Sequence, residues 1–299
     1  MSGMNEQRKG LLAAAFAFVI WGLFPLYWHL LKSVPADQIT AHRVVWSALL
    51  LTCLLCARQG LGWLRAIAAT PRALGLLAVA SVLIGGNWTL YIWAVNAGHV
   101  VETSLGYFIN PLLSVVLGVL VLGERLRRIQ WVAVAIAALG VAWLTWQAGR
   151  PPWIALGLSV SFGLYGLVRK LFRVEPVAGI GMESLYLLLP ALAWLAWAET
   201  GHGGSFFSGG VAPSVMLLLV ASGLVSALPL IAFTYGVQRI PLSTVGLMQY
   251  IGPTLQLLVG VLVFGEPFGQ VQLVGFACIW LALGIFAADG LHRSRRPRH

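Results

Sequence analysis

The chain has 299 residues, of which 59% are apolar and 9% charged, with a formal net charge of +10. A soluble chain is on average roughly 25% charged, and 19 basic plus 9 acidic side chains are too few to cover a soluble fold of this length. The composition therefore excludes an ordinary soluble domain and indicates an integral membrane protein. One membrane span takes about 20 apolar residues, so the chain has room for ten spans and for no separate soluble domain.

Ten apolar stretches follow one another along the chain, separated by short segments rich in Pro, Gly or Arg. They cover about residues 9–31, 38–57, 73–97, 101–122, 129–147, 152–172, 178–198, 212–237, 243–264 and 270–288. Strands of a membrane barrel alternate over about ten residues, whereas these stretches are longer and uniformly apolar. The sequence therefore predicts an all-α membrane protein with ten transmembrane helices. We expect the first stretch to remain as a span, because it is too long for a cleaved signal and further spans follow.

The basic residues fall on one side of this arrangement. If the N-terminus is cytoplasmic, sixteen of the nineteen Lys and Arg residues are cytoplasmic, and only Lys32, Arg43 and Arg150 lie outside. The bias predicts that both termini lie in the cytoplasm. It also accounts for the net charge, so no nucleic-acid partner is expected.

The sequence repeats itself at a distance of 142 residues. Residues 111–124 (PLLSVVLGVLVLGE) align without a gap with residues 253–266 (PTLQLLVGVLVFGE), and eight of the fourteen positions are identical. We expect two five-helix repeats, residues 1–148 and 149–290, followed by a basic tail at 291–299. Because five is odd, the second repeat must be inverted in the membrane, an architecture typical of transporters with a site between the halves.

Several longer strings point to a family. They are VPADQITAHRVVWS (34–47), LIGGNW (83–88), SLGYFINP (104–111), LGERLRRIQW (122–131) and QYIGPT (249–254). Through them nearly the whole chain resembles the drug/metabolite transporter superfamily in its ten-helix EamA form, and within it the RarD group. The resemblance implies an inner (plasma) membrane carrier that exports small metabolites or drug-like molecules without ATP. It implies no particular substrate.

Polar residues form a stripe in the corresponding span of each repeat. Thr103, Tyr107, Asn110 and Ser114 share one helical face, and the second half offers Gln249, Tyr250 and Gln256. Such groups lose hydrogen bonds when they face lipid. We therefore expect them to line a substrate pathway, with hydrogen bonding between helices as the alternative.

Both stripes also contain proline. A proline inside a helix removes one backbone donor and clashes with the carbonyl four residues earlier. Pro111, and Gly252 with Pro253, are therefore expected to break their helices and free the carbonyls of Tyr107 and Gln249. These breaks are predicted to act as hinges or binding points, and a satisfied kink is the alternative.

Few ionisable groups lie within the predicted spans, and each is a functional candidate. His42, Arg43 and Glu102 lie near the outer ends of their spans, with His29 at the same level. We expect Arg43 to pair with Glu102 as an outer gate or an anchor for a charged substrate, and an interfacial ion pair is the alternative. Glu183 is a candidate for a coupling proton, with simple solvation as its alternative.

Asn87, Tyr91 and Trp21 lie within their spans at positions where they can contact a substrate. The two aromatic rings are candidates to clamp an apolar or aromatic molecule, and ordinary packing is the alternative. Neither an ATP-binding loop nor a metal-binding motif occurs in the sequence, so we expect no cofactor and no metal.

The sequence favours a secondary transporter that works by alternating access and carries a small molecule across the bilayer. An integral-membrane enzyme acting on a lipid-linked substrate would need catalytic groups that converge at one depth, and only the outer level offers any. A membrane partner that transports nothing is the third possibility. The oligomeric state is not predicted.

Overall fold

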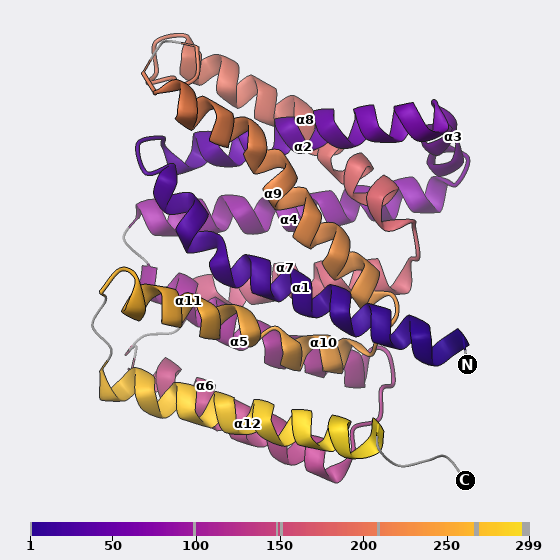
Figure 1. Ribbon diagram of the computed structural model, residues 1–299, viewed down its shortest axis with the longest axis vertical. Coiled ribbons are helices and arrows are strands. Elements are labelled where there is room, and N and C mark those ends of the chain that lie inside the picture. The colour runs from indigo at the N-terminus through magenta and orange to yellow at the C-terminus, as the bar shows by residue number, and fades with distance from the viewer. Residues whose placement is uncertain are drawn as a thin grey trace.

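All regular structure in the computed structural model is α-helical within the residues it describes, which are 2–97, 100–147, 149, 152–207, 210–265 and 269–294. Side chains at 2–4, 92, 95, 96, 100–102, 104 and 290–294 lie outside this description. The helices, shown in Figure 1, are α1 (Ser2–Leu30), α2 (Ala36–Gln59), α3 (Gly62–Ala68), α4 (Pro71–Asn96), α5 (Val100–Leu120), α6 (Arg128–Gln147), α7 (Trp153–Leu171), α8 (Pro176–Glu199), α9 (Pro213–Val237), α10 (Leu242–Met248), α11 (Ile251–Leu262) and α12 (Gln270–Ser294).

Each of the ten predicted spans corresponds to a helix or to the α10–α11 pair. Within the described ranges, nine segments are long and apolar enough to cross a membrane, and α5 contributes the shorter apolar stretch Leu105–Leu120. The prediction of an all-α protein with many membrane spans is therefore confirmed. The sequence did not predict α3, a seven-residue helix between α2 and α4.

Helix starts in the second half follow ordinary local rules. Pro176 and Pro213 lie in the first turn of α8 and α9, where a missing N–H costs nothing and the fixed backbone angle suits a helix. The Glu175 carboxylate accepts a hydrogen bond from the Ala178 N–H at 2.6 Å and caps α8.

The helices pack mostly against partners distant in the sequence. α1 contacts α9 and α11, α7 contacts α4 and α5, and α2 packs against α8. α6 and α12 form a pair along one side of the bundle (Figure 1), and α5 packs against α10 near the middle. In each of these contacts, a helix that precedes residue 148 packs against a helix that follows it.

Proline interrupts only one of the two helices in which we expected a break. The predicted break at Pro111 is wrong, because α5 continues from Val100 to Leu120 through it, while the hinge role of Pro111 stays a prediction. The loss of a single backbone hydrogen bond is tolerated when the turns on both sides remain bonded. The second break does occur, between α10 and α11, but the Gln249 carbonyl is not free, since it accepts the Gly252 N–H at 3.1 Å.

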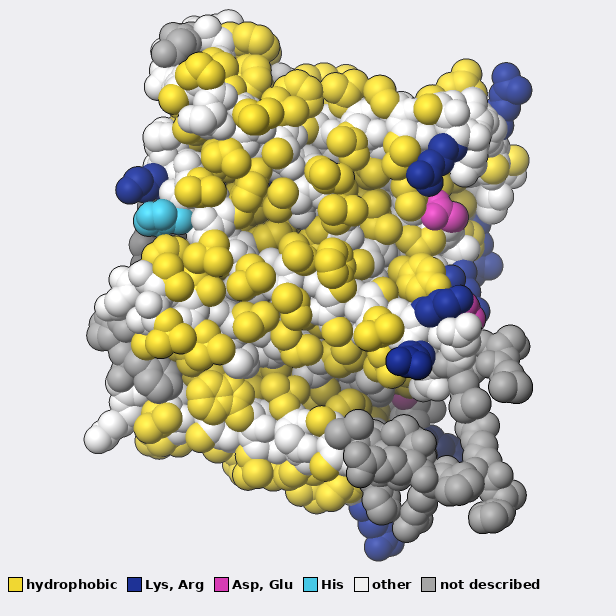
Figure 2. All heavy atoms as spheres, in the orientation of Figure 1, with side chains coloured by type: hydrophobic (Ala, Val, Ile, Leu, Met, Phe, Trp, Pro, Cys, Tyr) yellow, Lys and Arg dark blue, Asp and Glu magenta, His cyan; other side chains and the backbone are white. Residues whose placement is uncertain are grey.

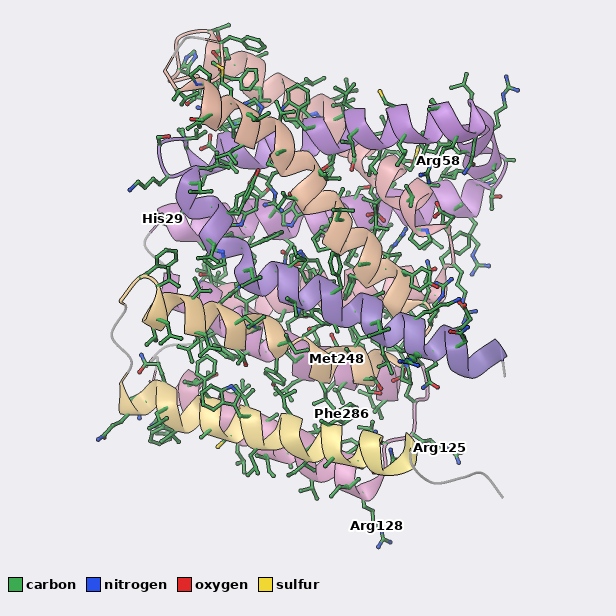
Figure 3. The ribbon with its side chains drawn as sticks, viewed as in Figure 1. His29, Arg58, Arg125, Arg128, Met248 and Phe286 are labelled. Atoms are coloured by element: carbon green, nitrogen blue, oxygen red, sulfur yellow. The ribbon has the colours of Figure 1, made fainter. Side chains whose placement is uncertain are left out.

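The face of the bundle seen in Figure 2 is largely apolar, and the charges visible on it gather mainly at one end. In Figure 2 hydrophobic side chains cover the middle of the face in view, and Lys and Arg lie mainly along one edge. Figure 3 places Arg58, Arg125 and Arg128 at that edge, where α1 begins, and His29 at the opposite edge. We call these the basic end and the His29 end. Such a broad apolar surface is typical of a face that contacts lipid.

Candidate functional site: a central cavity

A cavity of about 250 Å³ lies between the helices, and its walls come from α1, α2, α4, α5, α7, α9 and α10–α11. On α1 the lining begins at Phe18 and extends to Trp28, next to His29. The cavity therefore occupies the part of the bundle between its middle and the His29 end.

Most of the residues predicted to line a pathway lie on this wall. They are Trp21, Asn87, Tyr91, Thr103, Tyr107, Asn110, Gln249 and Gln256, and the predicted hinge residues Gly252 and Pro253 lie there too. Their side chains come from α1, α4, α5, α10 and α11 and converge on one space. Their part in transport stays a prediction.

The polar side chains on the wall are only partly satisfied. The Asn87 amide donates to the Leu158 carbonyl and to the Ser161 hydroxyl, both at 2.8 Å, and so fixes α4 on α7. The Gln249 amide donates to the Ser114 hydroxyl at 3.2 Å. Among the buried atoms described, Oδ1 of Asn110 and Oε1 of Gln249 have no hydrogen-bond partner. Two polar residues on the wall thus keep unused hydrogen-bonding capacity.

Other predicted residues lie elsewhere. Ser114 and Tyr250 are buried behind the wall, where Tyr250 donates to the Phe108 carbonyl at 3.2 Å. His42 is buried against the Phe206 ring, with 4.8 Å between ring centroids. The Glu102 side chain lies outside the described residues, so its predicted pairing with Arg43 stays untested.

Arg43 faces the cavity from α2. Its guanidinium carbon lies 4.8 Å from the ring centroids of both Trp28 and Trp88, and its Nε donates to the Ser226 hydroxyl at 2.7 Å. Cation–π contacts of this kind stabilise a guanidinium away from bulk water. Arg43 is the one residue with a formal charge among the described residues that line the cavity.

The sequence interpretation missed Phe24, Trp28 and Trp88, although they also line the cavity. A signal was available for the first two. Trp21, Phe24 and Trp28 follow each other at spacings of three and four, which places them on one face of α1.

Aromatic rings close the cavity toward the basic end. Trp21 and Phe162 meet edge to face with 5.7 Å between centroids, and Phe233 lies 5.6 Å from Trp21 and 5.3 Å from Phe162. Phe18 adds a fourth ring, 5.7 Å from Trp21. We call these four residues the aromatic floor.

A buried ion pair lies closer to the basic end than the aromatic floor. Arg169 on α7 and Glu183 on α8 approach to 3.1 Å with both side chains almost fully buried. The Tyr165 hydroxyl donates to the other oxygen of the same carboxylate at 3.1 Å. The solvated alternative for Glu183 is therefore wrong, and Arg169 is likewise not a solvated charge at the end of its span, because both charges are covered by packed helices.

Glu124 joins the start of α10 to the end of α5. Its carboxylate accepts the N–H groups of Leu242 and Ser243 at 2.6 and 2.9 Å, and the Ser243 hydroxyl at 2.6 Å. These are orphan donors of a helix N-terminus, which a carboxylate satisfies well. Lys170 adds two more hydrogen bonds at this end, donating to the carbonyls of Val237 and Ile240. These hydrogen bonds hold the helix ends together at the basic end.

Among the described residues, no group of three or more His, Cys, Asp or Glu side chains is placed to hold a metal ion. The arrangement as a whole is a small chamber of aromatic rings with a few polar groups, closed on one side. Such a chamber can hold a small molecule.

The model of the EamA-like transporter family matches the chain twice, over residues 8–146 and 151–287. The chain belongs to the EamA-like transporter family. It is a multi-span membrane protein of the drug/metabolite transporter type, and the resemblance to EamA proteins and their RarD group is confirmed.

Similar proteins match the chain almost end to end. Protein RarD of Streptomyces exfoliatus is 47% identical and covers 100% of this chain and 94% of its own length. Protein RarD of Escherichia coli K12 is 46% identical, with 98% of each chain covered. An uncharacterized transporter of Vibrio cholerae is 45% identical, again with 98% of each chain covered.

The fold also matches a solved structure. A protein crystal structure superposes with a TM-score of 0.69 at 20% identity and covers 92% of this chain and 96% of its own. The arrangement of helices is thus shared with a protein of distant sequence.

Proposed function

We propose that the protein is a secondary transporter that exports a small metabolite or drug-like molecule across the inner membrane by alternating access. The central cavity carries this proposal, because it lies between helices from both parts of the chain and ends blindly at the aromatic floor. A chamber reached from one side at a time is what alternating access requires.

The inverted repeat is part of the proposal, with one five-helix unit over residues 1–148 and the other over 149–290. A two-fold exchange of the repeats turns α1 into α7, α2 into α8, α4 into α9, α5 into α10–α11 and α6 into α12. Under this exchange the contacts of α1 with α9 and α11 become those of α7 with α4 and α5. The pairs α2–α8, α5–α10 and α6–α12 map onto themselves. The two matches to the family model support the same division.

We place the basic end in the cytoplasm, together with both termini, because positively charged segments stay on that side. In this orientation the cavity would face the periplasm, as in an outward-facing state. In the opposite state the ties made by Glu124 and Lys170 would open while the His29 end closes.

The experiment begins with the substrate. Metabolites released by cells with and without the protein are compared, and the compound that differs is tested for flux in proteoliposomes, with and without an imposed pH gradient. We expect a saturable flux, and a dependence on the pH gradient would indicate proton coupling. The absence of any difference in released compounds and of any flux would contradict transport.

Asn110→Leu and Gln249→Leu then test the cavity wall. Each change removes polar groups that face the substrate, so we expect flux to fall by about tenfold, which corresponds to about 1.4 kcal/mol. Thr145→Val is the control, since that hydroxyl lies on α6 and donates to the Val141 carbonyl of its own helix. Undiminished flux in folded Asn110→Leu and Gln249→Leu variants would show that these polar residues do not line the transport pathway.

A further inference from the structure

We propose that the cavity takes a small organic anion with a flat apolar or aromatic body, and that Arg43 binds its carboxylate. This inference rests on the proposed function, because it names the substrate class of the same cavity. Two observations support the inference: the aromatic lining of the cavity, and the position of Arg43, the one formal charge among the described lining residues.

The walls favour a flat apolar body. Trp21, Phe24, Trp28, Trp88, Tyr91 and Tyr107 contribute rings to the lining. Tyr91 and Tyr107 meet edge to face with 6.1 Å between centroids, and they are 37% and 41% exposed although they lie inside the bundle. Ring faces that are uncovered inside a cavity gain contact when a flat molecule enters.

The charge favours an anion. A guanidinium carries five N–H donors in one plane, and in Arg43 the Nε donor is bound to the neutral Ser226 hydroxyl. The Trp28 and Trp88 rings contact the guanidinium through their π faces and stabilise its charge without neutralising it. No carboxylate stands among the described residues that line the cavity, and the fork geometry of the guanidinium matches that of a carboxylate.

The position of Arg43 also fits a role in binding. Arg43 lies on the wall of the cavity rather than at the outer surface, and Ser226, which holds its Nε, is a lining residue on another helix, α9. The charge is therefore fixed between α2 and α9, two helices that pack against each other. A carboxylate bound there would leave the apolar body among the rings of α1, α4 and α5.

The test uses three probes of similar size, namely 3-phenylpropionate, its neutral amide, and the cyclohexyl analogue of the acid. Binding to the detergent-solubilised full-length protein is measured by isothermal titration calorimetry. We expect the aromatic acid to bind about tenfold or more tighter than the amide, the usual scale for a hydrogen bond to a charged group. The cyclohexyl acid should bind more weakly than the aromatic acid.

Variants assign the preference to Arg43. Arg43→Gln should remove the preference for the acid over the amide, whereas Arg43→Lys should retain part of it. Arg58→Gln, an equal loss of charge at the exposed basic end, should leave the preference unchanged. If wild-type protein binds acid and amide equally, or binds neither, or if Arg43→Gln keeps the preference, the inference is wrong.

Flux measurements separate this inference from the proposed function. Transport of a neutral compound without any preference for the acids would overturn the substrate class and leave the transporter intact. Tight binding of the aromatic acid without flux of any compound would overturn the transporter and leave the binding site intact.

Discussion

At the scale of single residues, the buried ion pair carries a large desolvation cost. Arg169 and Glu183 are 1% and 4% exposed in their side chains, and the Arg169 nitrogens find no well-aligned acceptor among the described residues. Taking two charges out of water costs several kcal/mol per ion before their attraction is counted. The pair therefore depends on both members being present.

Removing one member should leave an uncompensated charge. We expect Glu183→Gln to lower the free energy of unfolding by about 3 kcal/mol or more, measured by denaturation in mixed detergent micelles. The double variant Arg169→Met with Glu183→Leu replaces both charges by apolar groups and should recover most of that loss. A single variant as stable as the wild type would show that the pair contributes nothing.

The sequence shows where Arg169 and Glu183 lie along their spans, but it does not show that the two side chains are buried and paired with each other. Arg169 lies at the end of an apolar stretch next to Lys170, and by position alone it belongs with the charges that flank a span. Only the packing of α8 on the bundle decides that Glu183 meets it. In contrast, lining residues on α1, α4 and α5 could be predicted. Polar groups at helical spacing in an apolar span avoid lipid, and they therefore face other helices or a cavity.

At the scale of helices, the carboxylate of Glu124 fixes where α10 begins. Replacing it by alanine leaves three donors at the start of α10 without a partner. Losing a cap costs about 1–2 kcal/mol, which makes the form opened at the basic end roughly 5–30 times more populated.

This shift can be measured by labelling from the cytoplasmic side. Thr234→Cys introduces a thiol at a fully buried position, in a background in which alanine replaces Cys53, Cys56 and Cys278. We expect Glu124→Ala to raise its rate of modification by an impermeant maleimide in inside-out vesicles. Ser243→Ala removes the hydroxyl bond alone and should have a smaller effect. Equal rates in all three proteins would exclude a closing role for Glu124.

Two glycines allow helices to approach at equivalent places in the proposed repeats. A Cβ at Gly22 would lie 2.6 Å from the Leu255 Cβ, and one at Gly163 would lie 3.0 Å from the Leu113 Cδ2. Overpacking costs about 1–3 kcal/mol. We expect Gly22→Ala to destabilise more than Gly163→Ala, because a Cβ cannot move without its backbone whereas a methyl at the end of a side chain can.

Gly86→Ala is the matched control for the unfolding measurements, since nothing lies within 4 Å of a Cβ placed there. It should be neutral or slightly stabilising, given the better helix propensity of alanine. Equal losses at Gly22 and Gly86 would mean that helix propensity, and not close approach, sets the effect.

Hydropathy predicted the long helices well but not their finer breaks. The spans are defined by long apolar runs, which only a helix can accommodate in a bilayer. The effect of proline on a helix is harder to predict, because it depends on whether the backbone hydrogen bonds of the neighbouring turns are kept. Pro111 remains inside α5, while the chain around Pro253 divides into α10 and α11. The seven residues of α3 are too few for a periodic signal.

At the scale of the whole molecule, the orientation in the membrane can be tested from its loops. We expect Gly60→Cys, after α2, to react with an impermeant reagent only from the cytoplasm, and His202→Cys, after α8, only from outside. A C-terminal reporter that works only in the periplasm should stay inactive. Labelling of both positions from the same side would contradict the proposed inverted topology.

The sequence supports the division into two repeats strongly in one segment and only weakly elsewhere. The aligned segments 111–124 and 253–266 are clear because both close a helix with the same Gly-Glu pair. Elsewhere only single positions correspond, such as Trp21 with Phe162 at a distance of 141 residues. The shared helix contacts are needed to extend the correspondence to the whole chain.

The aromatic floor also has an electrical consequence. Phe18, Trp21, Phe162 and Phe233 pack with ring centroids 5.3–6.1 Å apart and offer water only one polar atom, the Trp21 indole nitrogen. A column of water, and with it a current of protons or other ions, has no continuous path through such a layer. A membrane that carries many copies of this protein can therefore keep its potential. Under the proposed alternating access, each passage requires a collective rearrangement of helices, which takes microseconds to milliseconds, and the turnover would then stay far below the conductance of an open pore.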